Sequence, residues 1–280
     1  MSAAEGAASG DNLGWYLYGV VAAGEATPRL DAGGLAVDPA HEVELVFEGP
    51  LAGVASRVSL HEFGETTLPE RLGDAAWLEQ KIRAHEQVLE RVLAAASVIP
   101  CRFCTVYRTE GELRRFLADH GEALRAALDR VQGQIEVDVK AFVDRERFVA
   151  AEAARNERVR RLQERAASMA AGRAYLERRR LEQLVSSEVD RLRSDASRDI
   201  HARLLAGAGD GLPLALQAAE VSGRENEMIF HGAYLVGPDE PAFKNALASL
   251  AAEYRDAGVD FELTGPWPPY NFVPMELQAS

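Results

Sequence analysis

The chain has 280 residues, enough for two domains that each have a core of their own. A net charge of −13 argues against a free-standing affinity for a phosphate backbone, which requires a basic surface. Two cysteines exclude a disulfide scaffold and suit a reducing cytosol, and no apolar run approaches the roughly 20 residues of a membrane helix. Residues 1–12 are small and acidic, so they predict a disordered tail and not a signal peptide.

The first half of the chain, residues 13–131, predicts a modified ferredoxin-like α+β domain. Only a loop with proline and glycine, residues 24–34, stands where such a unit has its first helix. The hydrophobic periodicity predicts strands at residues 15–21, 43–48, 51–58 and 98–107, and helices at residues 77–96 and 110–130.

The second half, residues 132–280, predicts a second ferredoxin-like domain with antiparallel strands and helices. Its first crossover is enlarged into a long charged helical hairpin, residues 144–206, with a break near residues 171–172 and a glycine-rich linker after it. Strands are predicted at residues 134–140, 213–221, 228–236 and 259–263, and a further helix at residues 239–258. The fold class is therefore α+β, with two ferredoxin-like-derived domains.

The segment at residues 265–273 reads Gly-Pro-Trp-Pro-Pro-Tyr-Asn-Phe-Val. Three prolines cannot continue a helix or a central strand, so this aromatic-proline tail is stiff and extended. Its rings, Trp267, Tyr270 and Phe272, either contact a partner or pack back across the C-terminal domain and latch it to the N-terminal one. Because the tail follows the last predicted strand directly, we interpret it as a strap that closes the second domain.

Cys101 and Cys104 form a CxxC motif inside the predicted strand at residues 98–107. Residues three apart on a strand face opposite sides, with Cα atoms about 10 Å apart, and a disulfide requires less than about 7 Å. A zinc site would need a second CxxC or CxxH, which the sequence lacks. A thiol protein is therefore kept only as an alternative.

The remaining sequence offers no catalytic centre, cofactor site or metal site. His85-Glu86 matches the start of a zincin motif, but Leu89 stands where the second histidine should be, so we expect a solvated or helix-face histidine. The chain contains neither a Gly-x-Ser-x-Gly elbow nor a Walker loop. We therefore expect an interaction protein and not an enzyme.

The basic run Arg178, Arg179 and Arg180 suggests either an interaction site or a nucleic-acid contact. Residues 144–203 contain 15 arginines against 11 acidic residues, but glutamates are interleaved throughout, which is typical of a salt-bridged, solvated helix face. An RNA-binding ferredoxin-like module stays an alternative, because the strand at residues 228–236 carries Phe230 and Tyr234. The basic-glycine-aromatic RNP1 pattern is missing, so no nucleic-acid partner is expected.

Four blocks of sequence together resemble the gas vesicle protein family GvpL/GvpF. They are Tyr-Leu-Tyr-Gly-Val-Val at residues 16–21, the passage at residues 85–107 with Ile-Pro-Cys-Arg-Phe-Cys-Thr-Val-Tyr, Gly-Arg-Ala-Tyr-Leu at residues 172–176, and the tail at residues 265–273. The resemblance covers essentially the whole chain, and the tail is its most specific block. One departure is Cys104, where the family usually has glycine, so a CxxC function is not a family property.

The resemblance implies a minor structural or assembly component of gas vesicles, the gas-filled, protein-walled organelles that give some prokaryotes buoyancy. It implies no enzymatic activity. The partners it implies are the small hydrophobic shell protein of the GvpA type and other minor gas vesicle proteins, with no lipid membrane. Such a protein would help to nucleate or build the vesicle wall and would be found in the gas vesicle or the cytoplasm. The tail and the hairpin are the candidate contact elements.

Overall fold

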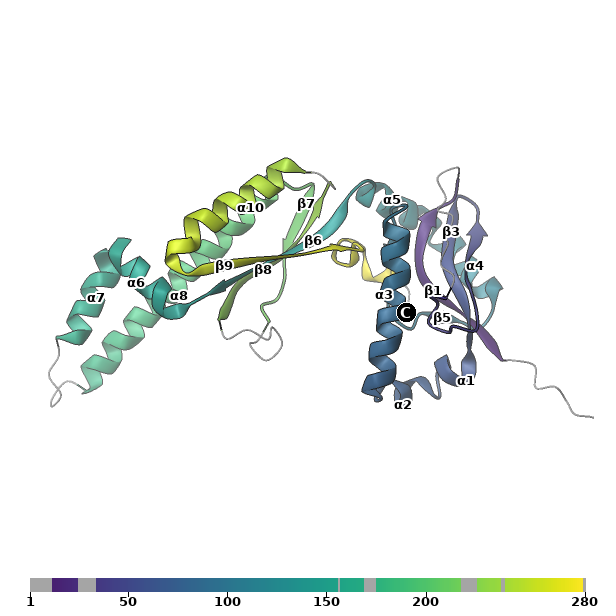
Figure 1. Cartoon of the computed structure of the whole chain (residues 1–280), viewed down its shortest axis with the longest axis horizontal. Helices are drawn as coiled ribbons and strands as arrows, with labels where there is room; N and C mark the ends of the chain where they lie inside the picture. The colour runs from purple at the N-terminus through teal and green to yellow at the C-terminus, as the bar shows by residue number, and fades with distance from the viewer. Residues whose placement is uncertain are drawn as a thin grey trace, which may run out of the picture. The chain divides into compact units, whose positions relative to one another are not determined.

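The structure, a computed structural model, describes residues 12–24, 34–155, 157–168, 175–217, 226–237 and 240–278 (Figure 1). The chain forms two compact units, the first made of Met1–Gln134 together with Trp267–Ser280 and the second of Ile135–Pro266. The end of the tail therefore belongs to the first unit, whereas the sequence placed it in the second domain. The predicted tail at residues 1–12, most of the loop at residues 24–34 and the break near residues 171–172 lie outside the described residues.

The first unit contains, among its described residues, an antiparallel sheet, five α-helices and two 3-10 helices, η2 (Tyr270–Phe272) and η3 (Met275–Leu277). Asp74 starts the longest of these helices, because its carboxylate accepts hydrogen bonds from the amides of Ala76 and Trp77. In chain order the elements are β1 (Leu13–Ala22), β2 (Val43–Glu48), β3 (Leu51–Ser59), α1 (Leu60–Phe63), α2 (Leu68–Leu72), α3 (Ala75–Leu93), β4 (Ile99–Pro100), β5 (Val106–Tyr107), α4 (Glu110–Asp119) and α5 (Gly121–Val131).

Strand β1 is buried along both of its faces. On one face Tyr16 and Tyr18 pack in a core with Leu89 of α3. On the other face Leu17 lies beside Gly53 of β3, where Leu113 of α4 also approaches. Helices thus cover both faces of this sheet (Figure 1), which explains why β1 reads as a nearly continuous apolar run.

Two predictions for the first unit are corrected. The single strand expected at residues 98–107 is split into β4 and β5, because a turn lies between them: Thr105 donates its amide to the carbonyl of Arg102 at 3.2 Å, and Cys104 has φ 66°. The single helix expected at residues 110–130 is two helices. His120, with φ −102° and ψ 9°, leaves the helical conformation between α4 and α5.

The second unit contains another antiparallel sheet with helices. Two of its strands, β6 and β8, pair side by side with a β-bulge between Ala141 and Phe142. In chain order the elements are β6 (Ile135–Val143), α6 (Arg145–Arg155), α7 (Glu157–Ala167), α8 (Tyr175–Leu205), β7 (Asp210–Pro213), β8 (Glu227–Val236), α10 (Pro241–Tyr254), the 3-10 helix η1 (Arg255–Ala257) and β9 (Val259–Trp267).

Helices α8 and α10 pack on one face of this sheet. Ile200 of α8 and Phe243 of α10 share a core with Tyr234 of β8, and α7 packs against the part of α8 that extends beyond the sheet (Figure 1). The strand expected at residues 213–221 is corrected: β7 ends at Pro213, where that strand was to begin, and residues 218–221 lie outside the described part. Proline has no amide to continue a ladder, and only Leu214 adds a bond, to the carbonyl of His231.

The two sheets share one spatial order of strands. The first runs β2-β3-β1-β4, with β5 also paired to β1, and the second runs β7-β8-β6-β9. Counted within each unit, both orders are second, third, first and fourth strand. The fold is therefore a mixed α/β fold with two antiparallel sheets, and the ferredoxin-like derivation of each stays an interpretation.

Candidate interaction surfaces

The tail residues 267–278, here called the C-terminal strap, dock on the first unit. Phe272 is 3% exposed, and its carbonyl accepts a hydrogen bond from Arg130 at 3.4 Å. The side-chain amide of Gln278 donates to the carbonyls of Tyr270 and Val273 at 2.7 and 2.9 Å. The backbone carbonyl of Gln278 in turn accepts from the amide of Arg102 at 2.8 Å. The strap is therefore a buried, hydrogen-bonded part of the first unit.

The hydroxyl of Tyr270 joins a chain of hydrogen bonds that leads into the core. It donates to Glu86 Oε1 at 3.1 Å and lies 3.1 Å from His85 Nε2, so Nε2 carries the proton and donates to it. Nδ1 of His85 then accepts from the hydroxyl of Tyr16 at 2.9 Å. Tyr16 also accepts the amide of Cys104 at 3.0 Å. The strap and β1 are thus connected through one buried imidazole.

Burial fixes the protonation states in this chain of hydrogen bonds. His85 is 1% exposed, and desolvation lowers its pKa to about 4, so the imidazole is neutral near pH 7. Desolvation also raises the pKa of Glu86, although the hydrogen bond from Tyr270 lowers it in part. The sequence placed His85 on a helix face, but its burial was not expected. These neighbours of the imidazole hold the strap in position.

The predicted contact residues divide between two environments. Tyr270 and Phe272 are held in the strap, while Trp267 at the start of the strap keeps 38% of its surface exposed. Arg179 and Arg180 are exposed on α8, in the other compact unit. Arg178 lies in the same helix, with its side chain outside the described part. The predicted residues therefore belong to two different compact units.

The two cysteines are free thiols that lack the features of a reactive pair. Cys101 is fully buried, and desolvation raises its pKa well above the usual range. Desolvation raises the pKa of Cys104 to about 12. A reactive cysteine needs a lowered pKa and access, so the thiol alternative is not supported. The sequence argument against a disulfide assumed that Cys101 and Cys104 lie on one continuous strand. The structure has a turn at Cys104 instead.

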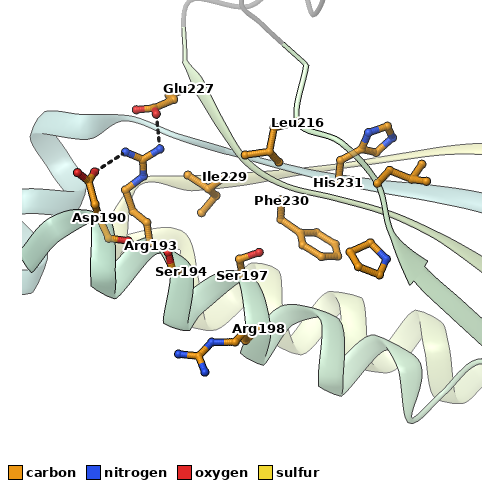
Figure 2. A pocket seen from close by; sticks show the side chains of 12 residues that line it. Asp190, Arg193, Ser194, Ser197, Arg198, Leu216, Glu227, Ile229, Phe230 and His231 are labelled. Atoms are coloured by element: carbon orange, nitrogen blue, oxygen red, sulfur yellow. Dashed lines mark hydrogen bonds and ion pairs between the residues drawn. The ribbon is translucent and has the colours of Figure 1, made fainter. Parts of the chain in front are cut away.

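A groove of about 580 Å³ opens between α8 and β8 in the second unit (Figure 2). The ring of Phe230 points from β8 toward the helix, and Leu216, which is 55% exposed, stands at the open side. Arg193 forms ion pairs with Asp190 at 3.2 Å and with Glu227, so the charged rim is neutralised at this end. The apolar lining consists of Pro213, Leu214, Leu216, Ile229 and Phe230.

The sequence alone did not reveal this groove. Its lining comes from three separated segments, and each apolar member is ordinary for a strand or its flank. The available signal was Pro213, which ends β7 early, so that among the described residues the regular β7–β8 ladder does not continue past Leu214 on this edge of β8. A short edge strand beside a long helix creates such a groove.

The described residues form neither a metal-binding cluster nor a membrane-spanning helix. Within residues 12–24, 34–155, 157–168, 175–217, 226–237 and 240–278, no three His, Cys, Asp or Glu side chains gather where they could hold a metal ion. In the same part of the chain, no helix is long and apolar enough to cross a membrane. The groove and the exposed start of the strap are two surfaces that the geometry offers for recognition.

The model of the family "Gas vesicle synthesis protein GvpL/GvpF" matches residues 14–274. Gas vesicle protein L of Streptomyces sp. (strain CB03234) is 32% identical over 92% of both chains, and gas vesicle protein L1 of Halobacterium salinarum is 27% identical over 93% of this chain and 90% of its own. In fold, the chain is similar to the crystal structure of the gas vesicle protein GvpF from Anabaena sp. PCC7120. That comparison gives a TM-score of 0.69 and 19% identity over 93% of this chain and 98% of the other. The chain belongs to the GvpL/GvpF family of gas vesicle proteins.

Proposed function

We propose that this chain is a minor structural and assembly protein of gas vesicles that binds the small hydrophobic shell protein and helps to nucleate or build the wall. The observation that carries the proposal is the open groove, with apolar residues on one part of its lining and charged residues on the other, on a chain that matches a gas vesicle family over residues 14–274. The protein has no enzymatic role in this account. It acts in the cytoplasm and at the growing gas vesicle, together with other minor gas vesicle proteins.

The mechanism follows from the chemistry of a shell subunit. A subunit whose face will meet gas exposes apolar surface before assembly, and such surface aggregates in water. The groove offers the exposed Leu216 as an apolar contact beside the neutralised Arg193 rim, a combination that suits an amphipathic segment laid into a groove. The subunit is covered while it is free and is released when it joins the wall.

The strap has a different role in this account. Tyr270 and Phe272 act as the latch that fastens the end of the chain to the first unit, because their contacts are buried and hydrogen-bonded. Trp267 keeps 38% of its surface exposed at the start of the strap, and this exposed part of its ring is the proposed contact with a partner. Arg178, Arg179 and Arg180 are not part of the shell contact.

Co-purification with the shell protein tests the groove directly. Leu216→Asp places a charge in the apolar lining and should reduce retained shell protein by about tenfold or more, the loss expected when an apolar anchor is removed. Leu72→Asp is the matched control, because Leu72 is 43% exposed on α2 of the first unit and should leave retention unchanged. Equal retention by both folded variants would eliminate the groove, and no retention by the unmodified chain would overturn the proposed function.

A second comparison tests the division of roles within the strap. Trp267→Ala should weaken shell binding with little change in stability, whereas Tyr270→Phe removes only a hydroxyl and should leave binding intact. Binding that survives Trp267→Ala in full would make the whole strap structural. The reverse result, a loss with Tyr270→Phe alone, would contradict the latch.

A further inference from the structure

A buried histidine of β8 holds the segment that forms one side of the groove. This segment, residues 214–217, is here called the flanking segment. His231 is 7% exposed and lines the groove together with Leu216 (Figure 2). Its backbone carbonyl accepts the amide of Leu214 at 2.8 Å, and its Nδ1 lies 3.2 Å from the carbonyl oxygen of Ala215. His231 therefore holds the flanking segment at two points, through its backbone and through its imidazole.

The other ring nitrogen of His231 faces a carboxyl group. Nε2 lies 3.6 Å from Oδ2 of Asp138, which belongs to the neighbouring strand β6. Among the described residues, neither Nε2 nor the second oxygen of Asp138, Oδ1, has a hydrogen-bond partner. The imidazole thus stands between two acceptors, the carboxylate of Asp138 on one side and the carbonyl of Ala215 on the other.

The number of protons on the pair decides whether both contacts are favourable. A carbonyl oxygen only accepts, so the bond to Ala215 requires a proton on Nδ1 of His231. In a neutral imidazole Nε2 is then a lone pair, which an ionised Asp138 repels. Both contacts are favourable when the pair holds one more proton, either as imidazolium beside carboxylate or as imidazole beside carboxylic acid. The observed arrangement is therefore that of the protonated pair.

The surroundings of the pair act on this proton in opposite directions. Desolvation raises the pKa of Asp138, while His231 and Lys140 lower it in part. Lys140 lies directly opposite His231 in the register of β6 and β8. Further charged groups on the surrounding elements are Glu136 of β6, Asp210 of β7, Glu227 of β8, Asp260 and Glu262 of β9, and Asp190, Arg193 and Arg198 where α8 lines the groove. Arg193 is paired with Asp190 and Glu227, so these three charges compensate one another.

We infer that the proton held between Asp138 and His231 controls the flanking segment and, with it, the apolar side of the groove. When the pair releases this proton to solvent, the imidazole keeps one N–H, and an ionised carboxylate is a stronger acceptor than a carbonyl. The N–H moves to Nε2, and the bond to Ala215 is lost. The flanking segment, which carries Leu216, is then held less firmly, so the groove changes its lining as the pH rises. This holds whatever binds in the groove and does not depend on the shell protein.

Nuclear magnetic resonance of the isotope-labelled full chain tests the inference between about pH 5 and about pH 9, the range in which histidines usually titrate. As the pH rises, the nitrogen shifts of His231 should show that Nδ1 loses its proton while Nε2 keeps one. In the same titration, the carbon shift of the Ala215 carbonyl should report the loss of its hydrogen bond. The backbone order parameter of Leu216 should fall from about 0.8 to below about 0.6.

Asp138→Asn distinguishes the pair from a histidine that titrates alone. The asparagine amide donates to Nε2, so Nδ1 keeps its proton and the Ala215 carbonyl should stay bonded across the pH range. Asp38→Asn is the matched control, because Asp38 lies 4.0 Å from His41 in the first unit, and it should leave the response of Ala215 unaltered. His231→Gln cannot titrate and should abolish the response as well. Circular dichroism checks that each variant is folded.

The Ala215 carbonyl decides the outcome. A carbon shift that does not change with pH in the unmodified chain would overturn the inference. So would a change that persists in folded Asp138→Asn or in folded His231→Gln. A full pH response in a chain that fails to retain the shell protein would support the inference and overturn the proposed function alone.

Discussion

The two compact units share one strand order but use it differently. In the first, α3 and α4 cover opposite faces of the sheet, and the C-terminal strap is fastened against this unit through His85 and Arg130. In the second, α8 and α10 share one face, and the crossover after β6 holds α6, α7 and α8. The comparison teaches that the same strand order can hold a docked C-terminal strap in one unit and carry long crossover helices in the other.

Phe272→Ala should give the largest difference in stability between the two units. Phe272 is 3% exposed, and its removal should lower the free energy of unfolding of the first unit by about 3 kcal/mol or more. Hydrogen exchange should accelerate in α3 and remain unchanged in α10. Phe243→Ala, a ring that is 2% exposed in the second unit, should give the opposite pattern. Equal acceleration in α3 and α10 for either variant would show that the units are not separate in stability.

The pH dependence of the free energy of unfolding tests whether His85 is neutral in the folded first unit. Its folded pKa of about 4 lies below the ordinary value of about 6.5, so the unfolded state takes up the proton first as the pH falls. Neutral His85 therefore makes its full contribution to the free energy of unfolding above about pH 6.5. This contribution is lost progressively toward pH 4, and its full size is about 3 kcal/mol. The raised pKa of Glu86 has the opposite sign, since its contribution is lost as the pH rises.

A variant isolates the histidine from its neighbours. His85→Gln keeps Glu86 and removes the titration of the imidazole, so the difference in unfolding free energy between the two proteins should be largest near pH 7.5 and shrink toward pH 4. Urea denaturation monitored by tryptophan fluorescence at several pH values measures this difference. A difference that stays constant across that range would contradict a neutral, buried His85.

The smallest effect concerns the turn between β4 and β5. Cys104 has φ 66°, in the left-handed region that costs a residue with a side chain about 1 kcal/mol relative to glycine. Cys104→Gly should therefore be more stable than Cys104→Ala by about 1 kcal/mol. At Cys101, which has no positive φ, the order should reverse, and Cys101→Ala should be the more stable variant. If chemical denaturation gave the glycine and alanine variants the same order of stability at Cys101 and at Cys104, the conformational explanation would be refuted.

Local patterns in the sequence predicted most of the elements. The alternation at residues 134–140 and the apolar stripe from residue 77 gave β6 and α3, because each signal lies within one element. The splits at Cys104 and His120 were missed, since they depend on backbone conformations at single residues that the surrounding fold selects. The charged hairpin was expected at residues 144–206, and α7 and α8 pack together there.

The recognition surfaces were less accessible to sequence reasoning. The tail was correctly singled out, but its docking on His85, 185 residues away in sequence, follows from tertiary structure alone. The groove joins α8 to segments around Leu216 and Phe230, and no pattern in any of the three predicts the others. Sequence motifs identified the family, whereas the contacts of the strap and the lining of the groove follow only from the three-dimensional structure.

Deletion of this chain in a vesicle-forming host tests the central claim most directly. Electron microscopy should show absent or malformed vesicles in the deletion strain. Normal vesicles should return with the unmodified chain and with Leu72→Asp, and should not return with Leu216→Asp at equal protein level. Fully formed, normal vesicles in the deletion strain would contradict a role in assembly, and full rescue by Leu216→Asp would contradict the groove as the site of that role.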